Sequence, residues 1–477
     1  MSFNDRSFAY AQLGYLLTVT VSLLILPGAS FWPTLMAMLG IWIAVALCYQ
    51  STAARNSAGW WTLLTATTLL AVGAIANIHF FTTAHGATTA DPVLLNVDAR
   101  ANFDSALFLL GQGESAHASC SLGYPMFIAG LWRITGITVV TPIVANMLMI
   151  LLTIIISGTI ATRVLSREQC QHSPQWLQTC AMIMTASICY LLNTGTIMIK
   201  DAGICLSMAT AGLGLTSLCV PSATTKTSLR MWGAFAAGII GVAIFRLNYL
   251  IFLFIATLII TPWRHGDWSM MRRAAIMIGT IAAVWLLSNW LLVDIWNRYT
   301  VGMHFPNEVM SGYFTSGQYS QHLYHDQVLG DYYDSSVWYR LLWLPINAAL
   351  LYFIPFPWDF ATYLDFGYTY AFAKFSYPWY IVGGLIIYHI LYMGRLSSAA
   401  IIHLTLAALI LWLIPAYLTA GSVSRYVLPL LTWLIPAAVA VADSQLRTRR
   451  FRIYAACYCI TMAAVLYVCH YLQHSVL

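Results

Sequence analysis

Charged residues are scarce in this chain of 477 residues, because Asp, Glu, Lys and Arg together make up only 8% of it. Soluble domains carry roughly 25% charged residues, so this composition excludes an ordinary soluble protein. In their place, 60% of the residues are hydrophobic and 14% are aromatic. The chain is therefore expected to be an integral membrane protein, in which most side chains face hydrocarbon or other helices.

Several familiar functional patterns are also missing. No GxGxxG turn follows a strand pattern, and neither a Walker loop nor an HExxH pair occurs, which argues against nucleotide-binding folds and zinc peptidases. The ten cysteines include no CxxC spacing, so the sequence predicts neither a zinc site nor a disulfide framework. The net charge of +6 comes without a basic stripe interleaved with aromatic residues, so nucleic acid is not an expected partner.

Apolar runs of about 20 residues recur along the chain, and a helix of that length crosses the hydrocarbon core of a bilayer. They leave no room for a separate soluble domain, so residues 1–477 are expected to form a single transmembrane domain. The first run lacks a small-residue cleavage site and is expected to stay as a membrane helix. The runs lie near 8–27, 31–49, 59–81, 139–161, 177–197, 202–220, 231–246, 248–263, 274–293, 341–356, 378–393, 399–418, 427–442 and 453–472.

Lysine and arginine mark the cytoplasmic loops, because short loops rich in these residues stay inside the cell. With the N-terminus inside, the first nine crossings put the loops 82–138, 198–201 and 294–340 outside. The residues that mark the inner side are Arg55, Arg163, Arg167, Lys226, Arg230, Arg264, Arg272, Arg273, Arg447, Arg449, Arg450 and Arg452.

One run must fail to cross if the arginine cluster at 447–452 is to stay inside. The best candidate is 341–356, because it is short and contains Pro345. We therefore predict an all-α polytopic membrane protein with about 13 transmembrane helices, in which 341–377 is re-entrant or lies in the outer interface. Of the 16 Asp and Glu residues, 12 then fall outside, so acidic residues gather on that side of the membrane.

The first large outer loop, 82–138, holds the most informative stretch, NVDARANFDSALFLLGQGESAHASCSLGYPMFIAGLWRITG. Helical spacing puts Asp98, Asn102 and Ser105 on one face of a short helix that Gly111 and Gly113 end. The tripeptide GYP at 123–125 opens a second short helix, closed by Gly136. Neither helix is long enough to span, so both are expected to rest at the membrane surface and shape a cavity. Carboxylates are costly there, so the sequence predicts a functional site in this loop.

The order of these features resembles the first outer loop of the GT-C fold glycosyltransferases, a superfamily that includes the protein O-mannosyltransferases and the aminoarabinose transferase of lipid A. The shared features are an outer Asp, a glycine that closes its helix, GYP, a second helix ending in Gly and a crossing that opens near Asn146. The resemblance covers roughly 60–445. Its later steps are Lys200-Asp201, Phe245-Arg246-Leu247-Asn248, Pro355-Phe356-Pro357-Trp358 and Ser424-Arg425-Tyr426.

The resemblance implies a multi-pass enzyme of the bacterial cytoplasmic (inner) membrane, with its active site facing the periplasm or exterior. Such an enzyme moves a sugar from a polyprenyl-phosphate donor to a hydroxyl of a lipid, glycan or protein acceptor, because nucleotide sugars are not available outside the cell. Membrane lipids are a further expected partner. An inverting transfer needs a general base at the acceptor hydroxyl and cations around the departing phosphate, whose negative charge grows in the transition state.

Asp98 is the predicted general base. Many members of the superfamily carry two adjacent acids at this place, whereas Ala99 follows Asp98 here, so Asp104 stays open as an alternative base. The structural alternative for Asp98 is an acid that only favours the N-terminal end of a surface helix.

Cations on the outer side are few, and two arginines next to helix ends are the leading ligands for the lipid phosphate. These are Arg246 and Arg425, since a guanidinium binds phosphate through two bonds. Lys200 and Arg100 are expected to support them. The structural alternative for each is anchoring of a helix end or snorkelling to the interface. The further residues expected to contact substrate are Asp201, Asn102, Tyr124, Tyr426 and Arg298.

The second large outer loop, 294–340, is rich in Tyr, Gly and Ser, and it is expected to bind substrate and close over it as a lid. His322 and His325 have a spacing that could ligate a divalent metal, but no third ligand is defined, so no cofactor is assigned. Two other functions stay open. A lipid-linked oligosaccharide polymerase or ligase of the O-antigen type would not need the first-loop carboxylate, and a transporter would show inverted repeats and mid-helix charges.

Overall fold

The computed structural model describes residues 10, 13, 14, 17, 28–52, 54–84, 97–113, 123–165, 170–219, 225–246, 249–264, 337–353, 377–392, 399–418 and 426–475. Within these ranges the chain forms helices joined by turns and loops, and it contains no strand. The prediction of an all-helical membrane protein is confirmed at this level.

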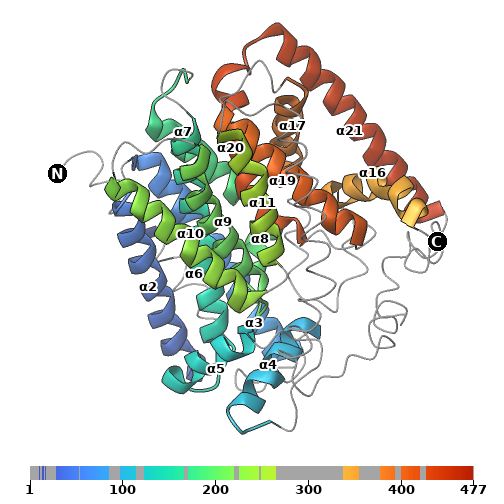
Figure 1. Ribbon diagram of the computed structural model, residues 1–477. Helices are drawn as coiled ribbons and strands as arrows, with labels where there is room; N and C mark the ends of the chain where they lie inside the picture. The colour runs from blue at the N-terminus through green and yellow to red at the C-terminus, as the bar shows by residue number, and fades with distance from the viewer. Residues whose placement is uncertain are drawn as a thin grey trace.

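The helices follow the apolar runs of the sequence closely. Figure 1 shows most of them packed side by side, with α4 and α5 at the lower end of the bundle and α21 along its right-hand side. The helices are α2 (Gly28–Gln50), α3 (Ser57–Ala84), α4 (Val97–Leu109), α5 (Gly123–Thr135), α6 (Val140–Val164), α7 (Pro174–Ala186), α8 (Cys189–Thr194), α9 (Asp201–Cys219), α10 (Thr225–Phe245), α11 (Tyr249–Arg264), α16 (Val337–Phe353), α17 (Tyr377–Leu391), α19 (Ala399–Leu418), α20 (Leu428–Ser444) and α21 (Arg449–Ser475).

The run at 177–197, predicted as one crossing, is broken into two helices. α7 ends at Ala186 and α8 begins at Cys189. At the break, the hydroxyl of Ser187 donates to the carbonyl of Met184 at 2.7 Å, a local bond that competes with continuation of the helix. Residues 195–200 then form a loop in place of the last turn of the predicted helix.

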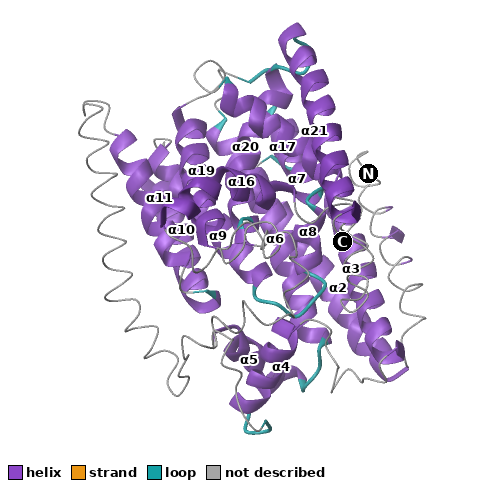
Figure 2. Ribbon diagram, turned by 90° about the vertical axis from the view of Figure 1, so that its right-hand side faces the viewer, coloured by secondary structure: helices purple, strands orange, loops and turns teal. Residues whose placement is uncertain are grey.

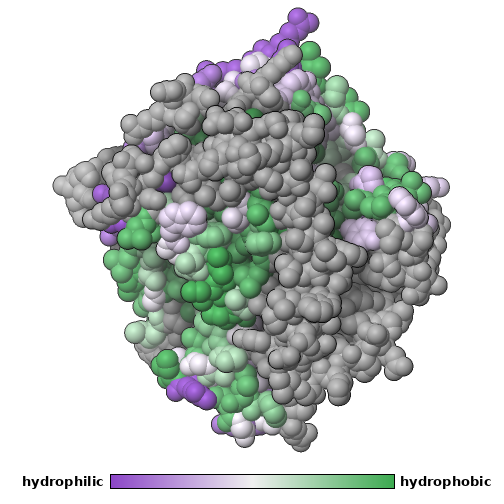
Figure 3. All heavy atoms as spheres, in the orientation of Figure 1, coloured by the Kyte–Doolittle hydropathy of each residue, from purple (hydrophilic) through white to green (hydrophobic). Residues whose placement is uncertain are grey.

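Four of the described helices are long and apolar enough to cross a membrane: Ser57–Ile78, Val140–Val164, Ala400–Tyr417 and Arg449–Val468. Shorter apolar helices in the described ranges are Met38–Gln50, Leu229–Phe245, Tyr377–Leu391 and Leu428–Ser444. In the view of Figure 3 the described surface is mostly hydrophobic, with hydrophilic residues toward its upper and lower edges. Such a band suits a helical bundle surrounded by lipid. Residues 274–293 and most of 8–27, each predicted to cross, lie outside the described residues.

Helix α20 is the centre of the bundle. Every residue from Leu428 to Asp443 is buried, and α20 contacts α6, α7, α9, α17 and α19. Its Trp433 ring packs on Gly212 of α9, where a side chain would overlap the ring, and the indole N–H donates to the carbonyl of Met208 at 2.9 Å. Small residues let helices approach this closely when no water drives their association.

Helix α16 contains most of the run 341–356, which the sequence predicts not to cross the membrane. It contains Pro345 and lies across the direction of α2 and α6 in Figure 1. It packs against α19, and the indole of Trp412 donates to the carbonyl of Ala348 at 3.1 Å. The remainder of the predicted segment, 354–376, lies outside the described residues.

Candidate functional site

The predicted site residues that the structure describes gather at the end of the bundle where α4 and α5 lie (Figures 1 and 2). Helix α4 packs against α5, and α5 packs against both α6 and α10. Hydrogen bonds from α4 and α6 attach the loop 195–200, which leads directly into α9. Segments far apart in the sequence therefore meet at this end.

Asn146 of α6 is the main support of that loop. Its side-chain nitrogen donates to the carbonyls of Ile197 at 2.7 Å and Ile199 at 2.9 Å, and its Oδ1 accepts a hydrogen bond of 3.1 Å from the hydroxyl of Tyr124. Asn146 and Tyr124 are both fully buried. Backbone carbonyls inside a membrane protein need partners, because water is not there to supply them. Asn146 thus supplies hydrogen-bond donors to the backbone carbonyls of a non-helical stretch of chain.

Two further asparagines hold the same loop from other helices. Asn77 of α3 donates to Thr196, at 3.3 Å to the carbonyl and 3.2 Å to the hydroxyl. Asn102 of α4 donates to the carbonyl of Met198 at 3.4 Å. Both amides are buried. The loop before Lys200 is therefore fixed by side chains of α3, α4 and α6.

The GYP step joins α5 to the end of α10. A Cβ at Gly123 would overlap the carbonyl oxygen of Ile244, so only glycine permits this contact. The Tyr124 ring lies 6.1 Å from the ring of Phe245, and Phe127 packs edge-on against Phe245 at 5.7 Å. Arg246 directly follows Phe245. The packing of α5 on the end of α10 therefore helps to position the backbone of this arginine.

Arg246 lies in the turn between α10 and α11 and stacks on tyrosine rings. Its guanidinium carbon is 4.3 Å from the ring centre of Tyr426 and 5.5 Å from that of Tyr249. The hydroxyl of Tyr249 donates to the carbonyl of Tyr426 at 2.9 Å, which ties the two rings together. Cation–π contacts of this kind hold a guanidinium in one orientation, and a hydrogen bond with the Tyr426 side chain adds to them.

Asp201 opens α9 close to this arginine. Its side chain is buried, 3% exposed, and the N-terminal end of a helix favours a negative charge. Burial alone would lower the pKa of the Arg246 guanidinium, but Tyr426, Tyr249 and Asp201 offset that effect and the pKa is raised. Arg246 therefore stays a cation at every physiological pH.

Helix α4 carries the predicted base. Asp98 lies one turn before Asn102, and its side chain lies outside the described residues. The helix was expected to rest flat on the membrane surface, but Asn102 and Ser105 on its polar face are buried against the protein, while Phe108 is 45% exposed. The polar face turns inward because the loop 195–200 offers it a carbonyl to bind.

Asp104, the alternative base, lies on another side of α4. Its carboxylate accepts a hydrogen bond of 2.8 Å from Arg100, one turn earlier, and both side chains are partly exposed. This is an ordinary i, i+4 ion pair on a helix surface. Arg100, predicted to support the lipid phosphate, is therefore paired with a carboxylate of its own helix.

The remaining predicted residues lie outside the described part of the chain. They are Arg425, Arg298, and the loop residues His322 and His325. Among the described residues, no group of three His, Cys, Asp or Glu side chains could hold a metal ion. The predictions of a lid at 294–340 and of a phosphate contact by Arg425 stay predictions.

Sequence reasoning did not single out Asn77 or Tyr249, and it noted Asn146 only as the start of a crossing. An asparagine within a long apolar run is the signal that was available, because an amide is costly in hydrocarbon unless it has a partner. Tyr249 offered no such signal, since aromatic residues are common at helix ends in membrane proteins.

A scan of protein-family models, a search of curated proteins and a search of solved structures found no match to this chain. The class that the fold defines is a polytopic helical membrane protein.

Proposed function

We propose that this protein is a GT-C type glycosyltransferase, which moves a sugar from a polyprenyl-phosphate donor to an acceptor hydroxyl on the outer face of a bacterial cytoplasmic membrane. The observation that carries the proposal is the hydrogen bond between Asn102 and the carbonyl of Met198. It joins the helix of Asp98 to the loop that leads into Lys200 and Asp201. An acid, a half-buried arginine and a lysine-acid pair thus belong to one end of the bundle, as a transfer to an alcohol requires.

Arg246 is the proposed ligand of the donor phosphate. Tyr426 and Tyr249 hold the guanidinium in one orientation, and the planar group can match two phosphate oxygens. As the sugar departs, negative charge builds on the phosphate, and a cation that is already oriented stabilises this charge without reorganising. Lys200 and Arg425 are proposed to assist, and Asp201 to hold the arginine.

Asp98 is the proposed general base, which removes the proton from the incoming hydroxyl. A positioned base typically contributes about 10² to 10⁴ in rate. Asp104 is less suited to this task, because Arg100 already binds its carboxylate and both lie on the partly exposed side of α4. Asn102, Tyr124 and Tyr426 then contribute by holding the walls of the site.

The test is transfer from a radiolabelled polyprenyl-phosphate sugar by the purified protein in lipid nanodiscs. The pair Asp98→Asn and Asp104→Asn is matched, since both remove one carboxylate from the same helix. We expect Asp98→Asn to lose about 10²-fold or more in turnover, and Asp104→Asn to retain most activity. The reverse outcome would assign the base to Asp104.

A second matched pair of variants distinguishes the loss of the proposed phosphate ligand from the loss of an arginine elsewhere in the protein. Arg246→Gln should abolish transfer, whereas Arg55→Gln, which removes an exposed arginine from the α2–α3 loop, should not. Full activity in Asp98→Asn, Asp104→Asn and Arg246→Gln would reject the proposal in favour of an O-antigen type polymerase or ligase, or a transporter. Mass spectrometry of envelope glycolipids and glycoproteins from a deletion strain would identify the sugar and the acceptor.

A further inference from the structure

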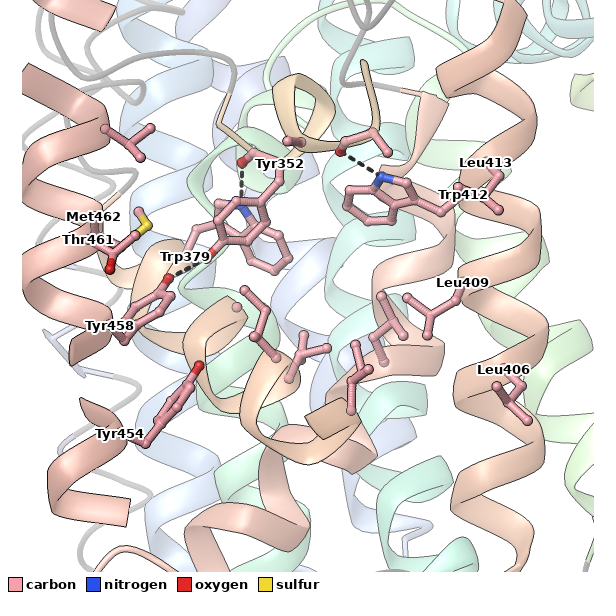
Figure 4. A pocket seen from close by; sticks show the side chains of 18 of the residues that line it. Tyr352, Trp379, Leu406, Leu409, Trp412, Leu413, Tyr454, Tyr458, Thr461 and Met462 are labelled. Atoms are coloured by element: carbon pink, nitrogen blue, oxygen red, sulfur yellow. Dashed lines mark hydrogen bonds between the residues drawn. The ribbon is translucent and has the colours of Figure 1, made fainter. Parts of the chain in front are cut away.

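A cavity of about 660 Å³ lies between α16, α17, α19, α20 and α21 (Figure 4). None of its lining residues belongs to α4, α5, α9, α10 or α11, so it is separate from the site around Arg246. In Figure 4, Tyr454, Tyr458, Thr461 and Met462 of α21 form one side, and the leucines of α19 form the other.

The walls of this cavity are largely apolar, because its tyrosine and tryptophan side chains are hydrogen-bonded within the protein. The hydroxyls of Tyr458 and Tyr454 donate to the carbonyls of Tyr380 and Gly384, each at 2.7 Å. Three further lining side chains also have protein partners: Tyr352 bonds to Tyr458 at 2.7 Å, Trp379 to the Tyr352 carbonyl at 3.0 Å and Trp412 to the Ala348 carbonyl at 3.1 Å. Rings and hydrocarbon side chains make up most of the remaining wall, so the cavity suits a hydrocarbon ligand.

Helix α21 gives this cavity its position in the bilayer. The cavity side of α21 runs from Tyr454 to Val465, and eleven helical steps cover about 16 Å. This is about half of the roughly 30 Å hydrocarbon core, so the cavity has the depth of one leaflet. Only 6% of the apolar window of α21 is buried inside the protein, and Ile460 on its other face is 71% exposed. The outer side of the helix that closes the cavity is therefore open to lipid.

A cluster of arginines stands at the beginning of the same helix. Its members are exposed side chains in the turn after α20 and in the first turn of α21: Arg447, Arg449, Arg450 and Arg452. Arg450 stacks over the ring of Tyr392 at 5.5 Å and lies one helical turn, about 6 Å, before Tyr454 at the cavity. Asp443, the nearby carboxylate, is buried and accepts hydrogen bonds from the backbone N–H groups of Gln171 and His172. This carboxylate thus binds the loop before α7.

We propose that these two features form one binding site for an anionic phospholipid, with a hydrocarbon chain in the cavity between α17, α19 and α21 and the phosphate at the arginine cluster. The distance from the arginine cluster to the far end of the cavity agrees with the length of one phospholipid. In one leaflet, the phosphate lies at the interface and the acyl chain reaches the middle of the bilayer. By the charge rule this is the cytoplasmic leaflet. The proposal stands apart from glycosyl transfer, which is assigned to the opposite end of the bundle.

The experiment is native mass spectrometry of the full-length protein with phosphatidylglycerol or phosphatidylcholine of identical acyl chains. We expect one phosphatidylglycerol to be retained more strongly than phosphatidylcholine. The double variant Arg449→Gln/Arg450→Gln should weaken phosphatidylglycerol about thirtyfold, at about 1 kcal/mol per arginine near a charged headgroup. Arg55→Gln, an exposed arginine on the α2–α3 loop, is the matched control and should have no effect.

A second pair tests the cavity. Thr461→Trp adds a large side chain to the cavity wall, whereas Ile460→Trp places the same ring on the lipid-facing side of α21. The first should weaken both lipids at least tenfold, and the second should weaken neither. Equal binding by the two tryptophan variants would overturn the proposal.

Two measurements on the unaltered protein do not depend on how the variants fold. Phosphatidylglycerol with a diazirine in one acyl chain should crosslink to 457–465 of α21 and to 406–413 of α19. Crosslinks confined to other helices would overturn the cavity assignment. Soluble glycerol phosphate, added in large excess, should fail to displace the lipid; full displacement would mean a site for free phosphate and would reject the lipid.

Discussion

The hydroxyl of Tyr124 donates to Oδ1 of Asn146 at 3.1 Å, and this single bond connects the GYP step of α5 to the loop before α9. The other end of the same amide holds the carbonyls of Ile197 and Ile199. One asparagine thus transmits the position of α5 to the segment that carries Lys200 and Asp201.

Asn146→Leu should destabilise the protein by about 2 to 4 kcal/mol, because it leaves two buried carbonyls without partners. Tyr124→Phe removes one bond and leaves the amide donors in place, so it should cost about 0.6 to 1 kcal/mol. Thermal unfolding in detergent, followed by tryptophan fluorescence, measures the difference. Equal losses in the two variants would show that the carbonyl contacts are not what matters.

Gly123→Ala should impair the site around Arg246, because the added methyl group overlaps the carbonyl of Ile244 and pushes α5 away from the end of α10. We expect transfer to fall at least tenfold with the protein still folded. Gly130→Ala in the same helix is the matched control. A Cβ there meets nothing within 4 Å, so this variant should be neutral or slightly stabilising.

Arg246→Lys keeps the charge and removes the planar group that stacks on Tyr426 and Tyr249. We expect KM for the donor to rise about tenfold, since an ammonium cannot bind two phosphate oxygens in the same geometry. Tyr426→Leu should have a similar but smaller effect, because a cation–π contact is worth about 0.5 to 2 kcal/mol. Steady-state kinetics against donor concentration distinguish both from a loss of kcat alone.

Cys170, in the loop between α6 and α7, should react slowly with maleimide at neutral pH. Burial, and secondly the charge of Asp443, raises the pKa of this thiol to about 11, so the reactive thiolate is rare below that pH. In a variant that keeps only Cys170, the labelling rate should rise about tenfold per pH unit from 7 to 10. Asp443→Asn should lower the pKa and speed labelling at pH 8.

The labelling rate in SDS, where the loop is unfolded, is the reference for that measurement. A rate in the folded protein equal to the SDS rate would contradict the burial of the thiol. Asp443→Asn should also loosen the loop that carries Cys170, because Asp443 accepts hydrogen bonds from the N–H groups of Gln171 and His172 and from the His172 ring.

The helices were predictable because each apolar run has few ways to bury its backbone groups in a bilayer. The run 139–161, for instance, corresponds to α6, Val140–Val164. Both short helices of the first large loop were predictable from glycines, and Gly111 and Gly136 indeed have φ of +74° and +80° just after those helices.

The break at Ser187 and the loop that follows were not predictable. Neither proline nor glycine marks the break, and a hydroxyl that bonds to its own helix leaves no pattern in the sequence. The inward turn of α4 was missed for a related reason. Asn102 and Ser105 look like a water-facing side until the partner carbonyl of Met198 is known.

Helix α20 has neighbours on every side, yet it follows α6, α7 and α9 in the sequence. Helices enter the bilayer in the order of the sequence, so α6, α7 and α9 are made before the helix that they share as a neighbour. Closure of the bundle is then a late event in biosynthesis, because it needs α20. A chain that stops before residue 428 would lack the buried helix around which α6, α7, α9, α17 and α19 pack.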